Sequence, residues 1–207
     1  APALIELPGR GRVLVFALGK ESSGVPRNWA AGKGGPGVNF LPDLSAQTAD
    51  AIARQVGAAK RSGDLVVASI HWGPNWGFVI SREQRDFAHR LIDAAGVDIV
   101  HGHSSHHPMA IEVHRGKPIL YGCGDLLNDY EGISCYEAYR GDLALMYFPT
   151  LDSTTGTLAS FAMTATQTRH FRVNRAPEDG AHWLEKTLNR EGRKFGTHVE
   201  RRPDNTF

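Results

Sequence analysis

The chain has 207 residues, of which 41% are hydrophobic and 22% are charged, and its formal net charge is +1. This composition is that of a globular protein and excludes disordered and collagen-like chains. The small charge, without a basic run interleaved with aromatics, argues against a nucleic-acid partner. No apolar stretch approaches the roughly 20 residues of a membrane span, so we expect a soluble chain. Two cysteines, Cys123 and Cys135, are too few to indicate an oxidising compartment, which leaves both the cytoplasm and the cell envelope open.

The first part of the chain predicts a strand, a long loop and a helix. Residues 12–18 (RVLVFAL) form a short apolar run of the kind that makes a buried strand. Glycine, proline and serine are frequent in residues 19–42, and a loop of that length is more often functional or capping than idle. Ser45 can cap a helix that carries apolar residues at helical spacing as far as Ala59 and ends near Gly63.

The next part alternates strand, helix and strand, which sets the expected fold class. Residues 64–71 form a second apolar run with His71 at its end. Ser81 begins a capping-box pattern, which predicts a helix that ends near Gly96. Residues 97–100 form a third buried strand. This alternation is typical of an α/β fold with a parallel sheet and right-handed crossovers.

The second half predicts short antiparallel strands and a final helix. Turn residues separate five short segments rich in apolar and β-branched residues. These segments are residues 110–114, 118–121, 143–148, 158–162 and 168–173. An amphipathic helix begins at about Pro177 and continues through Leu188. Since no repeat, linker or low-complexity tract interrupts the chain, we expect a single domain over residues 1–207.

Histidines gather where the third predicted strand ends. Four of the ten histidines fall within residues 100–107 (VHGHSSHH), and His71 closes the neighbouring strand. In open α/β sheets the carboxyl ends of parallel strands meet at one edge, where ligands bind. Neutral imidazole is a common metal ligand, so the pattern predicts a zinc, manganese or iron site rather than a calcium site. The expected ligands are His71, His103 and His106.

Each histidine also has a simpler interpretation as a hydrogen-bonded core or surface residue. For His107 we hold this interpretation and metal binding to be equally plausible. It is preferred for four histidines whose surroundings in the sequence offer no partner. These are His89, His170, His182 and His198.

The segment after the second strand offers a polar group beside a possible pocket wall. Asn75 could donate a hydrogen bond to negative charge that develops near His71. Trp72 and Trp76 flank it, and they either wall a pocket and exclude water or pack against the next helix. Both interpretations remain open at this point.

Acidic groups follow the strand that ends near residue 121. Asp125, Asp129 and Glu131 lie on a glycine-punctuated turn, where acid/base groups are often held. Asp125 either serves in catalysis or caps the turn. Glu112 is interpreted equally as a partner of Arg115 and as a residue that orients a ligand histidine.

Three segments together resemble a known family. They are SIHWG (residues 69–73), LIDAAGVDIVHGHSSHHPMAIEV (91–113) and GKPILYGCGDLLNDYEG (116–132). In this order they resemble the CapA-like proteins of poly-γ-glutamate or capsule synthesis, within the calcineurin-like metallophosphoesterase superfamily, over roughly residues 1–175. The resemblance implies a four-layer αββα sandwich with a divalent, often binuclear, metal site. It carries His71, His103 and His106 over as ligands.

The sequence departs from the superfamily pattern in three ways. His103 and His106 are three residues apart instead of two, and His101 with His103 offers the usual spacing, so the ligand assignment stays ambiguous. Gly124-Asp125 stands where many relatives have a Gly-Asn pair. The early D-x-H, GD and GNH motifs have no match before His71. We therefore expect the C-terminal part of a CapA-like domain with half a metal site, and a complementary N-terminal chain or fragment as a partner.

These observations support three hypotheses of function. The first is a hydrolase that acts on a phosphoester or on a peptide or poly-γ-glutamate-type polymer. In it a metal ion activates water, and Asn75 or a histidine such as His101 stabilises charge. The second is a peptide epimerase, in which the ion polarises a carboxylate while a histidine or Asp125 removes the α-proton. The third is a non-catalytic accessory protein that binds an anionic polymer or supports a synthase.

Overall fold

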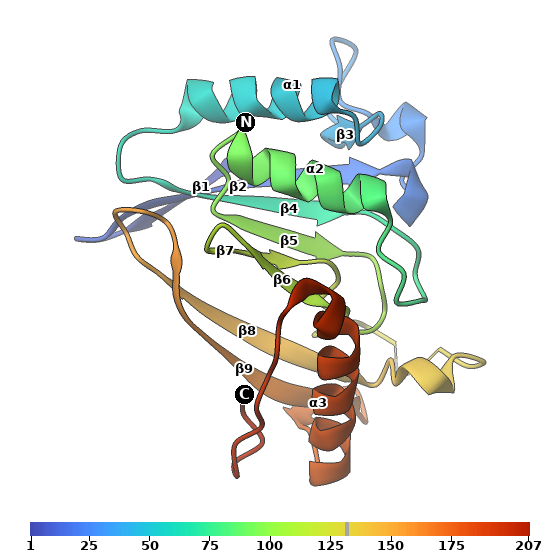
Figure 1. Cartoon of the computed structure of the whole chain (residues 1–207). Coiled ribbons are helices and arrows are strands. Elements are labelled where there is room, and N and C mark those ends of the chain that lie inside the picture. The colour runs from blue at the N-terminus through green and yellow to red at the C-terminus, as the bar shows by residue number, and fades with distance from the viewer. Residues whose placement is uncertain (131–132) are drawn as a thin grey trace.

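The computed structural model describes residues 1–130 and 133–207. A mixed sheet takes up the first part of the chain, with the strand order β1-β2-β4-β5-β7-β6 and β3 paired with β2 (Figure 1). Its strands are β1 (Ala3–Leu7), β2 (Gly11–Lys20), β3 (Phe40–Leu41), β4 (Leu65–His71), β5 (Ile99–His103), β6 (Ile111–His114) and β7 (Lys117–Leu120). Strands β2, β4, β5 and β7 run parallel, whereas β1 and β6 are antiparallel to their neighbours.

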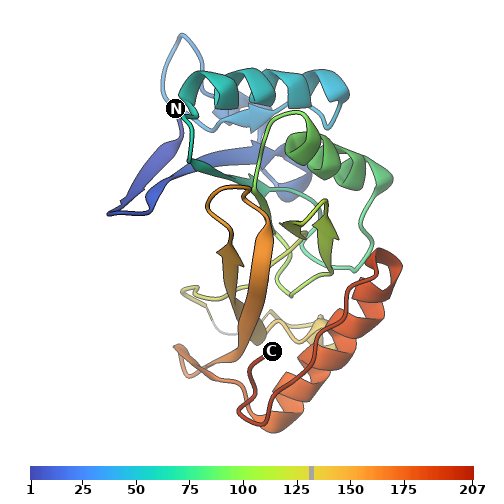
Figure 2. The ribbon, with the colours of Figure 1, turned by 60° about the vertical axis from the view of Figure 1, so that its left-hand side comes forward.

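Two helices cover one face of this sheet, α1 (Ala46–Ala59) and α2 (Arg82–Asp93) (Figure 2). Ser45 caps α1, and Ser81 caps α2 with the full capping box that the sequence predicts. Alternate strand residues point to the helices and form the core between the layers. Val66, Ala68 and Ile70 of β4 are fully buried there. The residues that alternate with them along the strand, which include Ser69 and His71, therefore face the opposite side of the sheet.

A second, three-stranded sheet with order β10-β9-β8 lies beside the first, and α3 (Glu178–Gly192) packs against it. Its strands are β8 (Leu143–Leu151), β9 (Leu158–Arg169) and β10 (Arg172–Arg175), all antiparallel. Figure 2 shows α3 alongside this sheet. Four short 3-10 helices complete the described elements: η1 (Glu21–Ser23), η2 (Arg27–Trp29), η3 (Glu137–Tyr139) and η4 (Arg193–Phe195).

The α/β class is confirmed, but several boundaries differ from those predicted. The third strand runs over Ile99–His103 rather than residues 97–100, so His101 and His103 belong to the strand itself. The strand predicted at 158–162 extends to Arg169 as β9, and the segment predicted as one strand at 168–173 crosses a tight turn into β10. The turn lies at His170 and Phe171, where φ is +54° at both residues. Strand β1 was not predicted, and its five side chains are all exposed although its sequence, ALIEL, is mostly apolar.

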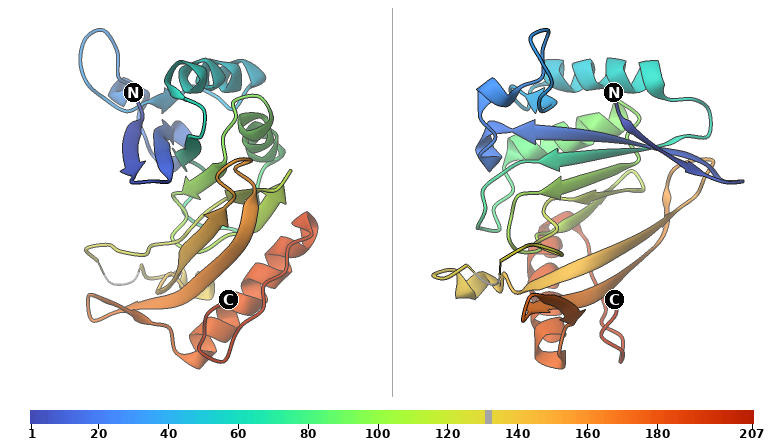
Figure 3. Two further views of the ribbon diagram at one scale, coloured as in Figure 1. Left: turned by 90° about the vertical axis from the view of Figure 1, so that its left-hand side faces the viewer. Right: turned by 180° about the vertical axis from the view of Figure 1, so that it is seen from behind.

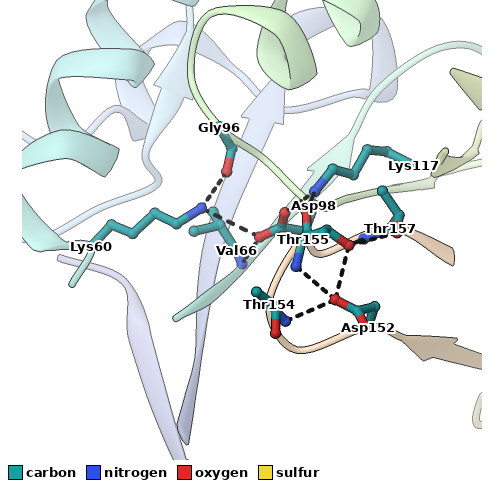
Figure 4. A network of polar contacts seen from close by, with 9 residues as sticks. All are labelled: Lys60, Val66, Gly96, Asp98, Lys117, Asp152, Thr154, Thr155 and Thr157. Carbon is teal, nitrogen blue, oxygen red and sulfur yellow. Dashed lines mark hydrogen bonds and ion pairs between the residues drawn. The ribbon is translucent and has the colours of Figure 1, made fainter. Parts of the chain in front are cut away.

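A buried carboxylate joins the two sheets at the end opposite to the carboxyl ends of the parallel strands (Figure 4). Asp98, just before β5, is 4% exposed and accepts hydrogen bonds from the Val66 amide and from Lys60. It also forms an ion pair with Lys117 of β7. Lys117 in turn donates to the carbonyl of Thr155 in the turn between β8 and β9, at 2.9 Å. One carboxylate thus links β4, β5, β7 and the turn of the second sheet.

Two further features bear on the sequence predictions. Cys123 is buried and Cys135 is exposed, and the two do not form a disulfide. Among the helices of the described residues, none is both long enough and apolar enough to span a bilayer.

Candidate functional site

The candidate site lies where β4 and β5 end side by side. In the register of these parallel strands, His71 is the neighbour of His103, and Ser69 is the neighbour of His101. All four side chains are on the face of the sheet that α1 and α2 leave uncovered. The topology therefore brings together residues that are distant in the sequence, as the predicted edge of parallel strands requires.

The imidazoles of His71 and His103 converge directly. Their Nδ1 atoms are 2.9 Å apart. Ser69 Oγ lies 3.2 Å from His103 Nε2 and 3.0 Å from His101 Nδ1. Neutral imidazoles satisfy all three contacts in either direction, with protons donated along the chain from His71 through His103 and Ser69 to His101 or in the reverse order.

Burial keeps these imidazoles neutral. The pKa of His103 is lowered to about 4, first by desolvation and then by the neighbouring His101 and His71. Burial likewise lowers the pKa values of His71 and His101. Neutral imidazole is the form that binds metal ions, so the cluster is in a ligand-competent protonation state at neutral pH.

His106 belongs to a different set of contacts. Its Nδ1 is 2.8 Å from Asp125 Oδ2, on the segment after β7. Tyr130 donates to the same carboxylate oxygen, and Asn128 Nδ2 lies 3.3 Å from it. Because an ionised carboxylate only accepts hydrogen bonds, the proton of His106 lies on Nδ1 and leaves Nε2 as an acceptor. Burial, followed by the bond to Asp125, raises the pKa of Tyr130 to about 12, so Tyr130 remains a donor.

Short polar contacts hold the segments that follow β4 and β5. Ser104 has φ of +126°, a conformation that residues other than glycine rarely adopt, and its hydroxyl donates to the Gly73 carbonyl at 3.1 Å. The amide of His106 donates to the backbone carbonyl of Asn75 at 3.0 Å. Asn75 itself is exposed beside these histidines. Its role in stabilising charge stays a prediction.

The long loop after β2 has a capping role at the same place. Ser23 of η1 donates to the His71 carbonyl at 2.8 Å, and Ser22 accepts from the Gly73 amide at 3.1 Å. These contacts fix the backbone at the exit of β4. Of the two roles expected for residues 19–42, functional or capping, these contacts support the capping role.

The two tryptophans have different roles. Trp72 is 2% exposed, donates to the Tyr121 carbonyl and stacks on the Tyr121 ring, so it belongs to the core. Trp76 lies beside the site, with its ring 5.2 Å from that of His106, and stacks on Tyr136 at 4.4 Å. The pocket-wall interpretation thus suits Trp76, and the packing interpretation suits Trp72.

Other candidates have structural partners elsewhere. His107 is fully buried among aromatic rings, in contact with Phe78, Trp76 and Tyr139. Glu112 accepts from Arg85, His89 and Tyr121, so neither of its two expected roles is correct.

Arg115 forms an ion pair with Asp93 instead of Glu112. Asp129 is exposed. Glu131 lies outside the described residues.

Within residues 1–130 and 133–207, no group of three or more histidine, cysteine, aspartate or glutamate side chains could hold a metal ion. His71 and His103 are brought together, whereas His106 is held by Asp125. The three-histidine metal site therefore stays a prediction.

Three site residues escaped the sequence analysis: Ser69, Tyr130 and Ser23. Of these, only Ser69 could have been found from the sequence, because it lies two positions before His71 and must share its face of the strand.

Comparison with known proteins identifies relatives. Residues 1–130 match the family described as Bacterial capsule synthesis protein PGA_cap. A probable polyglutamine synthesis accessory protein of Mycobacterium tuberculosis is 48% identical over 204 residues, which is 98% of this chain and 53% of that protein. The PGA biosynthesis protein CapA of Bacillus subtilis is 34% identical over 99 residues, 48% of this chain and 26% of that protein. The capsule biosynthesis protein CapA of Bacillus anthracis is 30% identical over 92 residues, 42% of this chain and 22% of that protein. The chain thus spans about half the length of its mycobacterial relatives.

Proposed function

We propose a function from the premise that the chain belongs to the bacterial capsule synthesis protein family PGA_cap. The histidine site at the ends of β4 and β5 would serve a metal-dependent hydrolytic step on a glutamate polymer or a related phosphoester. The observation that supports this proposal most directly is the convergence of two neutral imidazoles, with 2.9 Å between the Nδ1 atoms of His71 and His103.

Imidazole nitrogens are ligands suited to a divalent ion such as zinc, manganese or iron. A tetrahedral ion with bonds of about 2.0–2.1 Å to nitrogen separates two ligand nitrogens by about 3.3 Å, so a small opening of the His71–His103 pair would admit it. His106 offers a third nitrogen, Nε2, because Asp125 holds its Nδ1 proton. A carboxylate on the second nitrogen is typical of histidines that bind metals. When bound, the ion would lower the pKa of a bound water to near 7.

The remaining residues would position the substrate and stabilise charge. Asp125, itself held by Tyr130, would fix the ring of His106. Asn75 would donate to an oxygen on which negative charge develops. His101 is linked to His103 through Ser69, so it would act on the site through that hydroxyl.

The mycobacterial relatives are about twice as long as this chain. We therefore propose that a complementary N-terminal segment completes a four-layer αββα sandwich and supplies further ligands for a binuclear site. The face of the first sheet with Ser69, His71 and His103 is the face such a segment would cover.

Metal analysis tests the proposal first. Protein purified from medium with manganese, zinc and iron is expected to carry at least one equivalent of metal by mass spectrometry. The variant His71→Ala with His103→Ala should carry less than a tenth of that amount. The control variant His198→Ala, which changes an exposed histidine, should keep the metal.

Loaded protein is then assayed on an aryl phosphate and on a γ-glutamyl peptide. If the unchanged chain releases phosphate or glutamate and the double variant does not, the result supports hydrolysis. Deuterium from solvent at an α-carbon would instead indicate an epimerase, and protein without metal would overturn both enzymatic assignments for this chain.

A second candidate function is that of a non-catalytic accessory protein. The mycobacterial relative is a probable polyglutamine synthesis accessory protein, and the described residues supply no group of three or more metal ligands. In that case the double histidine variant would support polymer synthesis as well as the unchanged chain does.

A further inference from the structure

The hairpin formed by β9 and β10 carries an unusual concentration of positive charge. Arg169 and Arg172 are direct cross-strand neighbours, and Arg175 follows on β10. All three arginines are exposed. No aspartate or glutamate occurs anywhere in residues 153–177. Like charges placed directly opposite each other destabilise a strand pair, so this arrangement is unfavourable without an anion.

Among the described residues, no carboxylate forms an ion pair with Arg169 or Arg172 of the hairpin. Arg175 donates to a backbone carbonyl, that of Asp204, at 2.7 Å. Asp142, an acidic residue close to the hairpin, is already held by Arg140 and by Gln167. Arg175 also lies near the carboxyl group of Asp204, whose pKa it helps to lower. The exposed guanidinium groups of Arg169 and Arg172 are therefore the ones suited to bind a carboxylate through two parallel hydrogen bonds.

The arginines line a surface depression of about 630 Å³, together with Gln167, Asn174 and His170. A second depression, of about 540 Å³, includes Tyr136, Arg140 and Asp142. The two are adjacent, because Gln167 of the first donates to Asp142 of the second at 2.8 Å.

Tyr136 of the second depression stacks on Trp76, whose ring lies against His106. The hairpin and the segment around η3 lie at the same end of the molecule as the carboxyl ends of β4 and β5 (Figure 3, right). A series of contacts thus connects the hairpin with His106, through Gln167 and Asp142 and then through Tyr136 and Trp76.

We propose that the β9–β10 hairpin is a binding site for a polycarboxylate chain, which it presents to the histidine site through the depression at Tyr136 and Arg140. The identity of the polymer, a poly-glutamate, rests on the proposed function, whereas the binding site rests on the arginines alone. A flexible chain with one carboxylate per residue matches a row of guanidinium groups. The net charge of +1 for the whole chain gives no general attraction for polyanions.

Binding of fluorescein-labelled poly-γ-glutamate, measured by fluorescence anisotropy, tests this proposal. The variant Arg169→Gln with Arg172→Gln should raise the dissociation constant at least about tenfold. Lysine at both positions keeps the charge but loses the paired hydrogen bonds, and it should give a smaller loss. The matched control, Arg10→Gln with Arg54→Gln, removes two exposed arginines elsewhere and should bind as the unchanged chain does.

Two further measurements separate the alternatives. The variant His71→Ala with His103→Ala should keep the affinity, so failure of the hydrolytic function and failure of this binding site give different results. Binding should weaken as salt rises, because the charges are exposed.

Equal losses in the hairpin variant and its control would overturn the proposal. So would equal competition by a DNA strand of the same charge, or unchanged binding by the hairpin variant. Equal losses or equal competition would mean that binding follows general charge rather than this site. Unchanged binding would mean that the arginines serve only to keep an edge strand from pairing with other chains.

Discussion

The role of Asp125 is indicated by its contacts in the structure rather than by its place in the sequence. The sequence placed it on a turn after a strand and left its role open between catalysis and capping. Its carboxylate holds the Nδ1 proton of His106 and accepts from Tyr130. These partners lie 19 and 5 positions away, at separations that no local pattern in the sequence reveals. The histidine cluster itself was predictable, because it follows from where parallel strands end.

Replacement of Asp125 by asparagine tests this orienting role. The new side chain could present its amide NH₂ to His106 and favour the wrong tautomer, so metal affinity or hydrolytic activity should fall about 10- to 100-fold. The melting temperature should change little, because the residue is at the surface of the site. Unchanged affinity, measured by competition with a chelator, would show that Asp125 only caps its turn.

Acid stability depends on another carboxylate, Asp64. Its pKa is lowered to about 2, chiefly by the hydrogen bonds from Arg12, at 2.9 Å for Nε. The unfolded chain binds a proton near pH 3.8, so this contribution to stability is present above that pH and is lost as pH falls from about 4 to 2.

The variant Asp64→Asn should be less stable at pH 7 and should lose less on acidification. Urea unfolding at about pH 7, 4 and 2.5 measures both effects. Parallel curves for the variant and the unchanged chain would contradict this assignment.

Among the helices and strands, the sequence predicted boundaries best where a capping residue precedes apolar residues at helical spacing. The helix predicted from Ser81 begins where it should, with Phe87 and Leu91 buried. The pattern was least informative for β9, because the predicted segment 158–162 covers only its first part and the segment 168–173 crosses the turn into β10. The turn at His170 and Phe171 has positive φ without glycine or asparagine, and for that reason gave no turn signal.

The capping box of α2 gives a prediction at this scale. Ser81→Ala removes the acceptor for the Gln84 amide, at 3.1 Å, and should lower the free energy of unfolding by about 0.5–2 kcal/mol. Chemical denaturation measures the loss. Ser62→Ala, in an exposed turn, is the matched control and should have no effect beyond experimental error. Equal effects of both changes would mean that the cap contributes nothing.

For the molecule as a whole, the Asp98 network (Figure 4) and the candidate site lie at opposite ends of the parallel strands. The first sheet was predictable as a layer because its central parallel strands are apolar runs. Its joining to the second sheet was not predictable, because it depends on Lys117 reaching Thr155 across 38 residues. Asp98 stands out in the sequence only as a polar residue within a buried strand.

Gly156 makes the joining of the two sheets testable. Its φ is +65°, and a Cβ there would overlap the carboxylate of Asp98 and the amine of Lys117. Gly156→Ala should therefore destabilise the protein by about 1–3 kcal/mol. The control is Gly57→Ala in α1, where a Cβ meets open space and alanine favours the helix, so stability should rise by up to about 1 kcal/mol. Equal stability of the Gly156 variant and the unchanged chain would show that the turn is free to move.

The contrast between the two thiols has a practical consequence. Cys123 is enclosed, and burial raises its pKa to about 12, so it will not react with maleimides while the chain is folded. Cys135 is open to solvent and adjoins Tyr136, which stacks on Trp76. A dye added to the natural sequence should consequently attach at one position only. A dye on this cysteine could therefore report the binding of a polymer near Tyr136 by a change in its fluorescence, without any engineered residue.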